Sequence, residues 1–152
     1  VARYALDLSV QAAETALAET SDGFAALRKY MHTALDRGVG VLNLIYPLIN
    51  DPDWTGRRAE SAMLLDAMLE RGKQDGLVRD DARVPDIGFA IIRHSRPVAA
   101  GLAVSDERAI AHRHLDIYID GLHTGKHTNT LSAPAALDQF DPTRPVEIGG
   151  DG

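Results

Sequence analysis

The sequence predicts an all-α fold, a single helical bundle of about six helices, and three observations support this prediction. Apolar residues recur at intervals of three and four along most of the chain, whereas the alternation typical of half-buried strands is rare. The chain has 152 residues, the length of one ordinary domain. Its composition, 45% apolar and 25% charged, is typical of a globular protein that buries a core.

Two amphipathic helices are predicted in the first part of the chain, separated by a polar break at residues 21–23. The first helix covers residues 4–20, and its apolar face consists of Leu6, Val10, Ala13 and Leu17. Ser21 and Asp22 can cap the second helix. The apolar face of this second helix consists of Phe24, Leu27, Met31, Ala34 and Leu35.

A short apolar segment and a long helix are predicted next. Residues 41–49 are nearly all apolar, contain Pro47, and are followed by a turn-forming cluster at 50–53. The long helix is expected from about Trp54 to Asp75, with a broad apolar stripe around Met68. Gly76 then stands where a left-handed C-terminal cap is expected.

Two more helices complete the predicted bundle. Pro85 is well placed at the first position of one helix, and Pro97 and Gly101 must end or kink it. Ser105 is expected to cap the last helix, which ends near Leu122. This last helix has two apolar stripes. One stripe consists of Ile110, His114, Ile117, Tyr118 and Gly121. The other consists of Ala111, Leu115, Ile119 and Leu122. Two stripes predict a helix that is buried on two sides.

The helical pattern stops at His123. The remaining residues contain Gly, Thr, Ser and three prolines, a composition that favours an extended chain. We therefore expect one domain over residues 1–122, followed by an extended C-terminal tail over residues 123–152.

Composition argues against several classes of function. The chain has no cysteine, which excludes disulfides, thiolate catalysis and Cys-ligated zinc. Its net charge is −6 and its basic residues form no dense cluster, so we expect this chain not to bind nucleic acid by itself. It has no apolar run of 18 residues and no secretory leader, so we expect a cytoplasmic protein without a membrane contact.

The spacing of reactive side chains predicts no catalytic or metal site. His112 and His114 are two residues apart, which on a helix directs them to different sides. The serines occur in no strand–turn–helix elbow, and no glycine-rich phosphate loop is present. We therefore expect no metal, no cofactor and no enzymatic activity.

Two stretches carry a more specific pattern. The first is Leu69–Asp80 (LERGKQDGLVRD) followed by VPDI at 84–87, and the second is His112–Leu122 (HRHLDIYIDGL). Together, in this order and spacing, they resemble the C-terminal domains of the TetR family of transcriptional regulators, with agreement in helix order from about residue 1 to 122. The resemblance implies an effector-binding and dimerisation domain. The helix-turn-helix that reads operator DNA in this family matches no part of this chain, so contact with DNA is expected only through a segment outside it.

A cavity between the helices is the expected site of a small, mostly apolar effector. The candidates on inward faces are Tyr30, Met31, Leu35, Tyr46, Met63, Met68, Phe89 and His94. Any of them can instead simply fill the core. Tyr30 and His94 are the most informative, because each carries a polar group that needs a partner once buried. Either group can bind a ligand or bond to a backbone carbonyl.

The last helix is the expected homodimer interface. A single-domain core needs only one of its two apolar stripes, so the stripe Ile110, His114, Ile117, Tyr118 and Gly121 is available for a partner. In the TetR family the last two helices of each subunit build that interface. The alternatives are a central helix in a monomeric bundle and, for the function, a small helical enzyme or a ligand-free adaptor that only dimerises.

Overall fold

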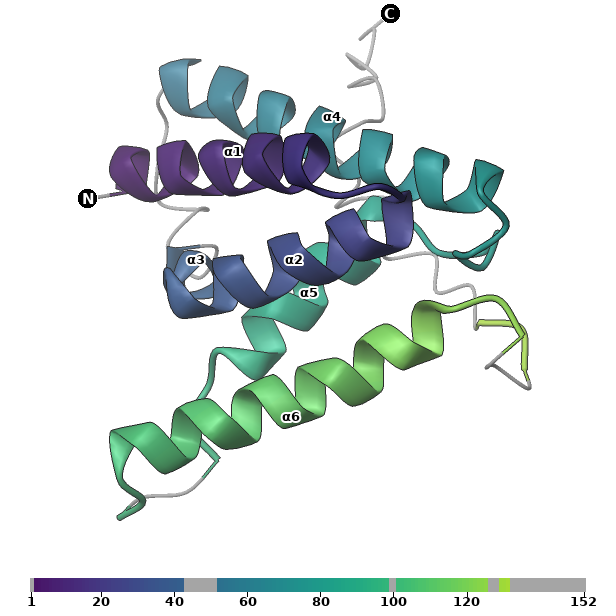
Figure 1. The fold of residues 1–152 in the computed structure, drawn as a ribbon. Helices are drawn as coiled ribbons and strands as arrows, with labels where there is room; N and C mark the ends of the chain where they lie inside the picture. Colours follow the sequence, from purple (N-terminus) through teal and green to yellow (C-terminus); the bar gives the residue numbers. More distant parts are fainter. Residues whose placement is uncertain (1, 43–51, 99–100, 126–128, 132–152) are drawn as a thin grey trace, which may run out of the picture.

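The structure of the protein is a computed structural model that describes residues 2–42, 52–98, 101–125 and 129–131 (Figure 1). Within these residues all regular secondary structure is helical, apart from one isolated antiparallel bridge between Val78 and His123. The prediction of an all-α fold is therefore confirmed.

The described residues form five helices of at least 11 residues and one single turn of helix. The helices are α1 (Ala2–Glu19), α2 (Gly23–Asp36), α4 (Pro52–Gln74), α5 (Val84–His94) and α6 (Val104–Leu122), and the single turn is α3 (Val39–Leu42). The expected number of about six is reached only if α3 is counted. Most of the predicted apolar segment 41–49 lies outside the described residues.

The helices are arranged so that α6 forms one side of the bundle. In Figure 1, α1 and α4 run side by side at the top, α2 and α5 occupy the middle, and α6 lies along the bottom. Helix α6 contacts α2 and α5, and its opposite side meets no other described helix. This position leaves one face of α6 available at the surface.

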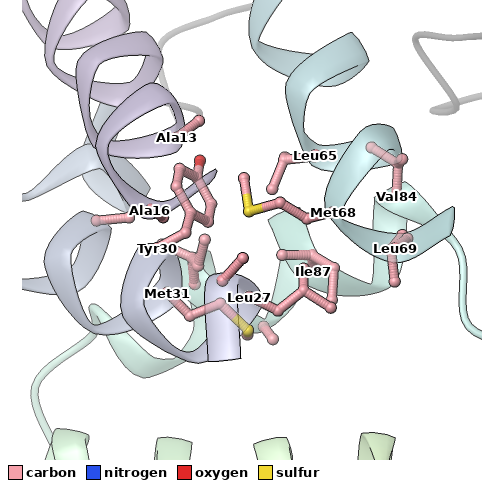
Figure 2. Packing of buried hydrophobic residues seen from close by; sticks show 14 of the residues in the cluster. Ala13, Ala16, Leu27, Tyr30, Met31, Leu65, Met68, Leu69, Val84 and Ile87 are labelled. Carbon is pink, nitrogen blue, oxygen red and sulfur yellow. The ribbon is translucent and has the colours of Figure 1, made fainter. Parts of the chain in front are cut away.

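The core lies between α1, α2, α4 and α5, and α6 contributes Leu115, Ile119 and Leu122 to it. Its largest fully buried side chains include Leu27, Tyr30, Met31, Met68 and Ile87, which converge in Figure 2. Helix α1 contributes mainly small side chains, namely Ala12, Ala13 and Ala16. Because alanine has only a Cβ, the α1 backbone packs close to α2 and α4.

The start of α2 packs directly against the end of α4 at two glycines. A Cβ atom at Gly23 would lie 2.1 Å from the backbone nitrogen of Gly72 and 2.6 Å from the carbonyl oxygen of Met68. The amide of Gly23 also donates a 3.1 Å hydrogen bond to Asp75 Oδ2. Only glycine permits so close an approach between the two backbones.

Most of the predicted helix signals have the expected roles. Asp22 caps α2 by accepting a 2.7 Å hydrogen bond from the amide of Ala25. Gly76 follows α4 with a positive φ of 71°, the left-handed conformation that glycine adopts most readily. Pro85 occupies the first turn of α5, at the second helical position, because the helix begins at Val84.

The predicted cap of α6 is wrong by two residues. The N-cap is Ala103 rather than Ser105, and the Ala103 carbonyl accepts hydrogen bonds from the amides of Asp106 and Glu107, both at 3.0 Å. Ser105 therefore lies inside the first helical turn. Asp106 and Glu107 still place two carboxylates at the positive N-terminus of the helix, as expected.

Candidate functional site

Three of the predicted ligand-binding residues meet in the core. Tyr30 is 2% exposed, and Met31 and Met68 are fully buried. Figure 2 shows Tyr30 and Met31 from α2 and Met68 from α4 beside one another among aliphatic side chains. The sequence therefore identified residues that lie together, although it left open whether they bind a ligand or fill the core.

The Tyr30 hydroxyl belongs to a buried group of three hydroxyls, which we call the hydroxyl trio and which consists of Ser9, Tyr30 and Ser61. Ser9 Oγ lies 2.9 Å from the Tyr30 hydroxyl and 2.9 Å from Ser61 Oγ. The three residues come from α1, α2 and α4 and are at most 7% exposed. Burial raises the pKa of Tyr30, so its hydroxyl keeps its proton at neutral pH. The trio satisfies the polar atom of Tyr30 within the core.

Met63 and Phe89 do not lie on inward faces, and these two expectations are wrong. Met63 is 69% exposed and Phe89 is 36% exposed. Met63 is five residues from buried Met68, which places it about 140° away around the helix. Phe89 is two residues from buried Ile87, about 200° away. Hydrophobic character suggested burial at these positions, but the helical period directs both side chains away from the core.

The remaining predicted ligand residues give different outcomes. Leu35 is half-buried and packs against the core. The Nδ1 atom of His94 donates to the carbonyl oxygen of Ala90, one turn earlier in α5, at 2.6 Å. Of the two roles considered for His94, the backbone bond is therefore the one that the structure contains. Tyr46 lies outside the described residues.

Helix α6 buries one of its two predicted stripes and exposes much of the other. Leu115, Ile119 and Leu122 belong to the predicted stripe that starts at Ala111, and they are buried. We call this stripe the inner stripe and the one from Ile110 to Gly121 the outer stripe. On the outer stripe Ile117 is 64% exposed and His114 is exposed, while Ile110 and Gly121 are half-buried. The outer stripe therefore has an exposed isoleucine at its centre.

Tyr118 does not belong to the exposed part of that stripe. It is half-buried, and its hydroxyl donates a 3.0 Å hydrogen bond to the carbonyl oxygen of Asp86 in α5. Its ring also meets the edge of His94, with 6.0 Å between ring centroids. Burial raises the pKa of Tyr118 far above its ordinary value. Tyr118 lies only one residue from Ile117, which turns it about 100° toward α5.

A polar network that the sequence analysis missed joins α2 to α6. Both helices carry the same pattern, Arg-x-x-x-His-x-x-x-Asp, and the two copies run antiparallel against each other. We call this network the Arg–His–Asp ladder, and it consists of Arg28, His32 and Asp36 on α2 and Arg108, His112 and Asp116 on α6. Spacing of four residues places all members of one copy on one face of their helix.

The two copies of the ladder are related by an approximate two-fold arrangement. His32 Nε2 lies 2.8 Å from Asp116 Oδ1, and His112 Nε2 lies 2.7 Å from Asp36 Oδ1. The two imidazole rings are nearly parallel, with 12° between their planes and 4.9 Å between centroids, and their Nδ1 atoms are 2.6 Å apart. At the two ends of the ladder, the guanidinium of Arg28 lies 2.8 Å from the carboxylate of Asp116, and that of Arg108 lies 3.9 Å from the carboxylate of Asp36.

A second polar cluster fixes the end of α6 to the turn between α4 and α5. The guanidinium of Arg79, which is 6% exposed, forms two hydrogen bonds with Asp81, at 2.5 and 2.9 Å. It also donates to the carbonyls of Gly121 and Asn129, at 3.2 and 2.7 Å. Asp81 in turn accepts a 2.9 Å bond from the amide of Leu131. These contacts hold the described part of the predicted tail against the bundle.

The described residues contain no group of three or more His, Cys, Asp or Glu side chains arranged to hold a metal ion. In the part of the chain that the structure covers, no helix is both long and apolar enough to cross a membrane. Comparisons of the chain with protein-family models, with curated proteins and with solved structures gave no significant match.

Proposed function

We propose that the chain is the effector-binding and dimerisation domain of a TetR-like transcriptional regulator. The observation that carries this proposal is the outward face of α6, where Ile117 is 64% exposed on a helix that forms one side of the bundle. A second copy related by a two-fold axis would bury this face in a four-helix interface. The all-helical fold and the TetR-like stretches at 69–80 and 112–122 support the same assignment.

The effector in this proposal is a small, mostly apolar molecule with one hydrogen-bonding group. In this proposal the hydroxyl trio supplies the polar contact, because it is a group of donors and acceptors within an otherwise apolar core. Met31 and Met68 lie beside Tyr30, and their unbranched side chains can change rotamer to admit a ligand. Because both methionines are fully buried, the effector has to displace core side chains when it enters.

In this proposal, DNA is bound only by a helix-turn-helix that lies outside this chain. The net charge of −6 supports the separation, since a DNA-binding surface requires clustered cations. The parent protein would act in the cytoplasm. Binding of the effector would alter the tilt of α1 and α4 and so reposition the DNA-binding segment.

A ligand-free adaptor that only dimerises is the second candidate function. The hydroxyl trio favours it, because Ser9, Tyr30 and Ser61 form hydrogen bonds with one another and leave no need for a ligand. Thermal unfolding separates the two candidates: small molecules of the proposed class raise the Tm of an effector-binding domain and leave that of an adaptor unchanged.

Replacing Ile117 by glutamate is expected to convert the dimer into a monomer. The carboxylate would be desolvated in an apolar interface without a cationic partner, which weakens dimerisation by at least ~100-fold. Sedimentation velocity measures the change. Ala67→Glu is the matched control, since it adds the same charge at an exposed position on α4 and should leave the dimer intact. If Ile117→Glu sediments like the unaltered chain, the interface lies on another face.

Replacing Tyr30 by phenylalanine tests the effector site. The variant keeps the Ser9–Ser61 hydrogen bond and loses one hydroxyl, so it should cost only about 1 kcal/mol of unfolding free energy. The Tm increase produced by an effector that bonds to this hydroxyl should fall sharply. A full thermal response in Tyr30→Phe would place the ligand away from the hydroxyl trio.

A further inference from the structure

The centre of the Arg–His–Asp ladder contains three contacts that each require a proton. Ionised carboxylates only accept hydrogen bonds, so the Nε2 atoms of His32 and His112 must both be protonated where they meet Asp116 and Asp36. The two Nδ1 atoms, 2.6 Å apart, form a hydrogen bond only if one of them also carries a proton.

Two neutral imidazoles supply only two N–H protons, one fewer than these contacts need. Without the third proton, two nitrogen lone pairs face each other at 2.6 Å, or a nitrogen lone pair faces a carboxylate. Either contact is repulsive. A third proton on either ring removes this repulsion, and the two imidazoles together then carry one positive charge.

We propose that the His32–His112 pair is a proton-binding switch that fastens α6 to α2. In its closed state the pair shares an extra proton and all three hydrogen bonds are formed. When the proton leaves, the Nδ1 atoms repel each other and the α2–α6 contact weakens. This inference concerns contacts within one chain and does not depend on the proposed regulatory function.

The charged groups around the pair support a site for a shared proton. Asp36 and Asp116 face the two rings directly, while Arg28 and Arg108 approach the same carboxylates from the outer ends of the ladder. With both carboxylates and both guanidinium groups ionised, these four charges cancel. The extra proton therefore adds one positive charge to a balanced network.

Two further cations near the ladder, one on α2 and one directly after it, are engaged with α1 instead. Lys29 forms an ion pair with Glu19, and Arg37 donates a 3.1 Å bond to the carbonyl oxygen of Leu8. The side chains of His32 and His112 are 23% and 25% exposed, so the shared proton exchanges with solvent. The switch can therefore respond to the pH of the medium.

The direction of the pH response follows from the number of protons bound. In the unfolded chain, histidines titrate near their ordinary pKa of about 6.5, so above this pH the two rings hold two protons. The folded pair holds three while the switch is closed. Above about pH 6.5 the folded pair binds one proton more than the unfolded chain, so stability from the switch falls as the pH rises. Below about pH 6.5 the two unfolded rings bind four protons, one more than the closed pair, so this contribution also falls as the pH decreases.

Urea unfolding at fixed protein concentration, from pH 7 to 8.5, tests the proposal with the variant His32→Gln/His112→Gln. We expect the ratio of wild-type to variant folding constants to fall with rising pH, by up to about tenfold per pH unit, the limit for one linked proton. Arg93→Gln is the matched control: it introduces the same side chain at an exposed position on α5, away from the ladder, and should follow the wild type. Parallel pH profiles for the wild type and the double variant would overturn the proposal.

Nitrogen-15 NMR of the histidine side chains provides a test that does not require a folded variant. At pH 7, we expect the resonances of His32 and His112 in the wild-type protein to show three N–H protons distributed over the two rings. Two neutral rings, each with a single protonated nitrogen, would contradict the proposed switch.

Discussion

The Gly23→Ala variant is expected to lose about 3 kcal/mol of unfolding free energy, because the added methyl group has no room. Its Cβ would lie 2.1 Å from the nitrogen and 2.5 Å from the Cα of Gly72, and both are backbone atoms that no side-chain rotation can move. Helices α2 and α4 would have to separate at this point. The Gly23 amide would then also lose its 3.1 Å hydrogen bond to Asp75.

Gly88→Ala is the matched control for this prediction. Gly88 is inside α5, and a Cβ added there meets no atom within 4 Å. Alanine is the better helix former, so this substitution should stabilise the protein by about 0.5–1 kcal/mol. Urea denaturation of both variants therefore gives opposite signs for the same chemical change. A Gly23→Ala protein as stable as its parent would show that α2 and α4 are not in contact at the two glycines.

Arg79→Ala is expected to lose a similar amount, about 3 kcal/mol, for an electrostatic reason. The substitution removes four hydrogen bonds at once, to Asp81 and to the carbonyls of Gly121 and Asn129. Asp81 would keep its charge without a cationic partner in the cluster, with backbone amides such as that of Leu131 as its remaining donors. Arg93→Ala, at an exposed position on α5, is the control and should change stability by less than about 0.5 kcal/mol.

The same cluster predicts a stability loss in acid. Hydrogen bonds from Arg79 hold the pKa of Asp81 well below its ordinary value. A carboxyl with a lowered folded-state pKa contributes stability that is present above its unfolded pKa, about 3.9, and lost as the pH falls below it. Comparison of the wild type and Arg79→Ala at pH 6 and pH 2.5 measures this effect. The difference between the two proteins should shrink at pH 2.5, and a constant difference would contradict the assigned role of Asp81.

The helices themselves could be predicted from the sequence, because their information is local. The period of apolar residues gave the five longer helices, and the chemistry of Asp22 and Gly76 gave two of their ends correctly. The cap at Ser105 was assigned wrongly, because a serine beside two acidic residues is equally suited to the first turn. Met63 and Phe89 were assigned inward on hydrophobicity, although their positions on the helical period place them away from the core.

The candidate sites were harder to predict, because they depend on which helices meet. Tyr30 is a buried polar group, as the sequence predicts, but Ser9 lies 21 residues from Tyr30 and 52 residues from Ser61 along the chain. The Arg–His–Asp ladder joins residues 72 to 88 positions apart. Its signal was present as the repeated Arg-x-x-x-His-x-x-x-Asp pattern. That pattern shows which residues share a helical face, and only the packing of α6 against α2 shows that the two faces meet.

The outward face of α6 as a two-fold interface is the central claim, and dipolar spectroscopy between spin labels tests it most directly. The chain has no cysteine, so a single introduced cysteine gives one label per chain. Arg113→Cys places the label at an exposed position one helical turn from Ile117, and Ala67→Cys places it on α4. We predict a discrete distance between labels at residue 113 that is shorter than the distance at residue 67. The absence of any discrete distance between labels at 113, or a shorter distance at 67, would contradict the claim.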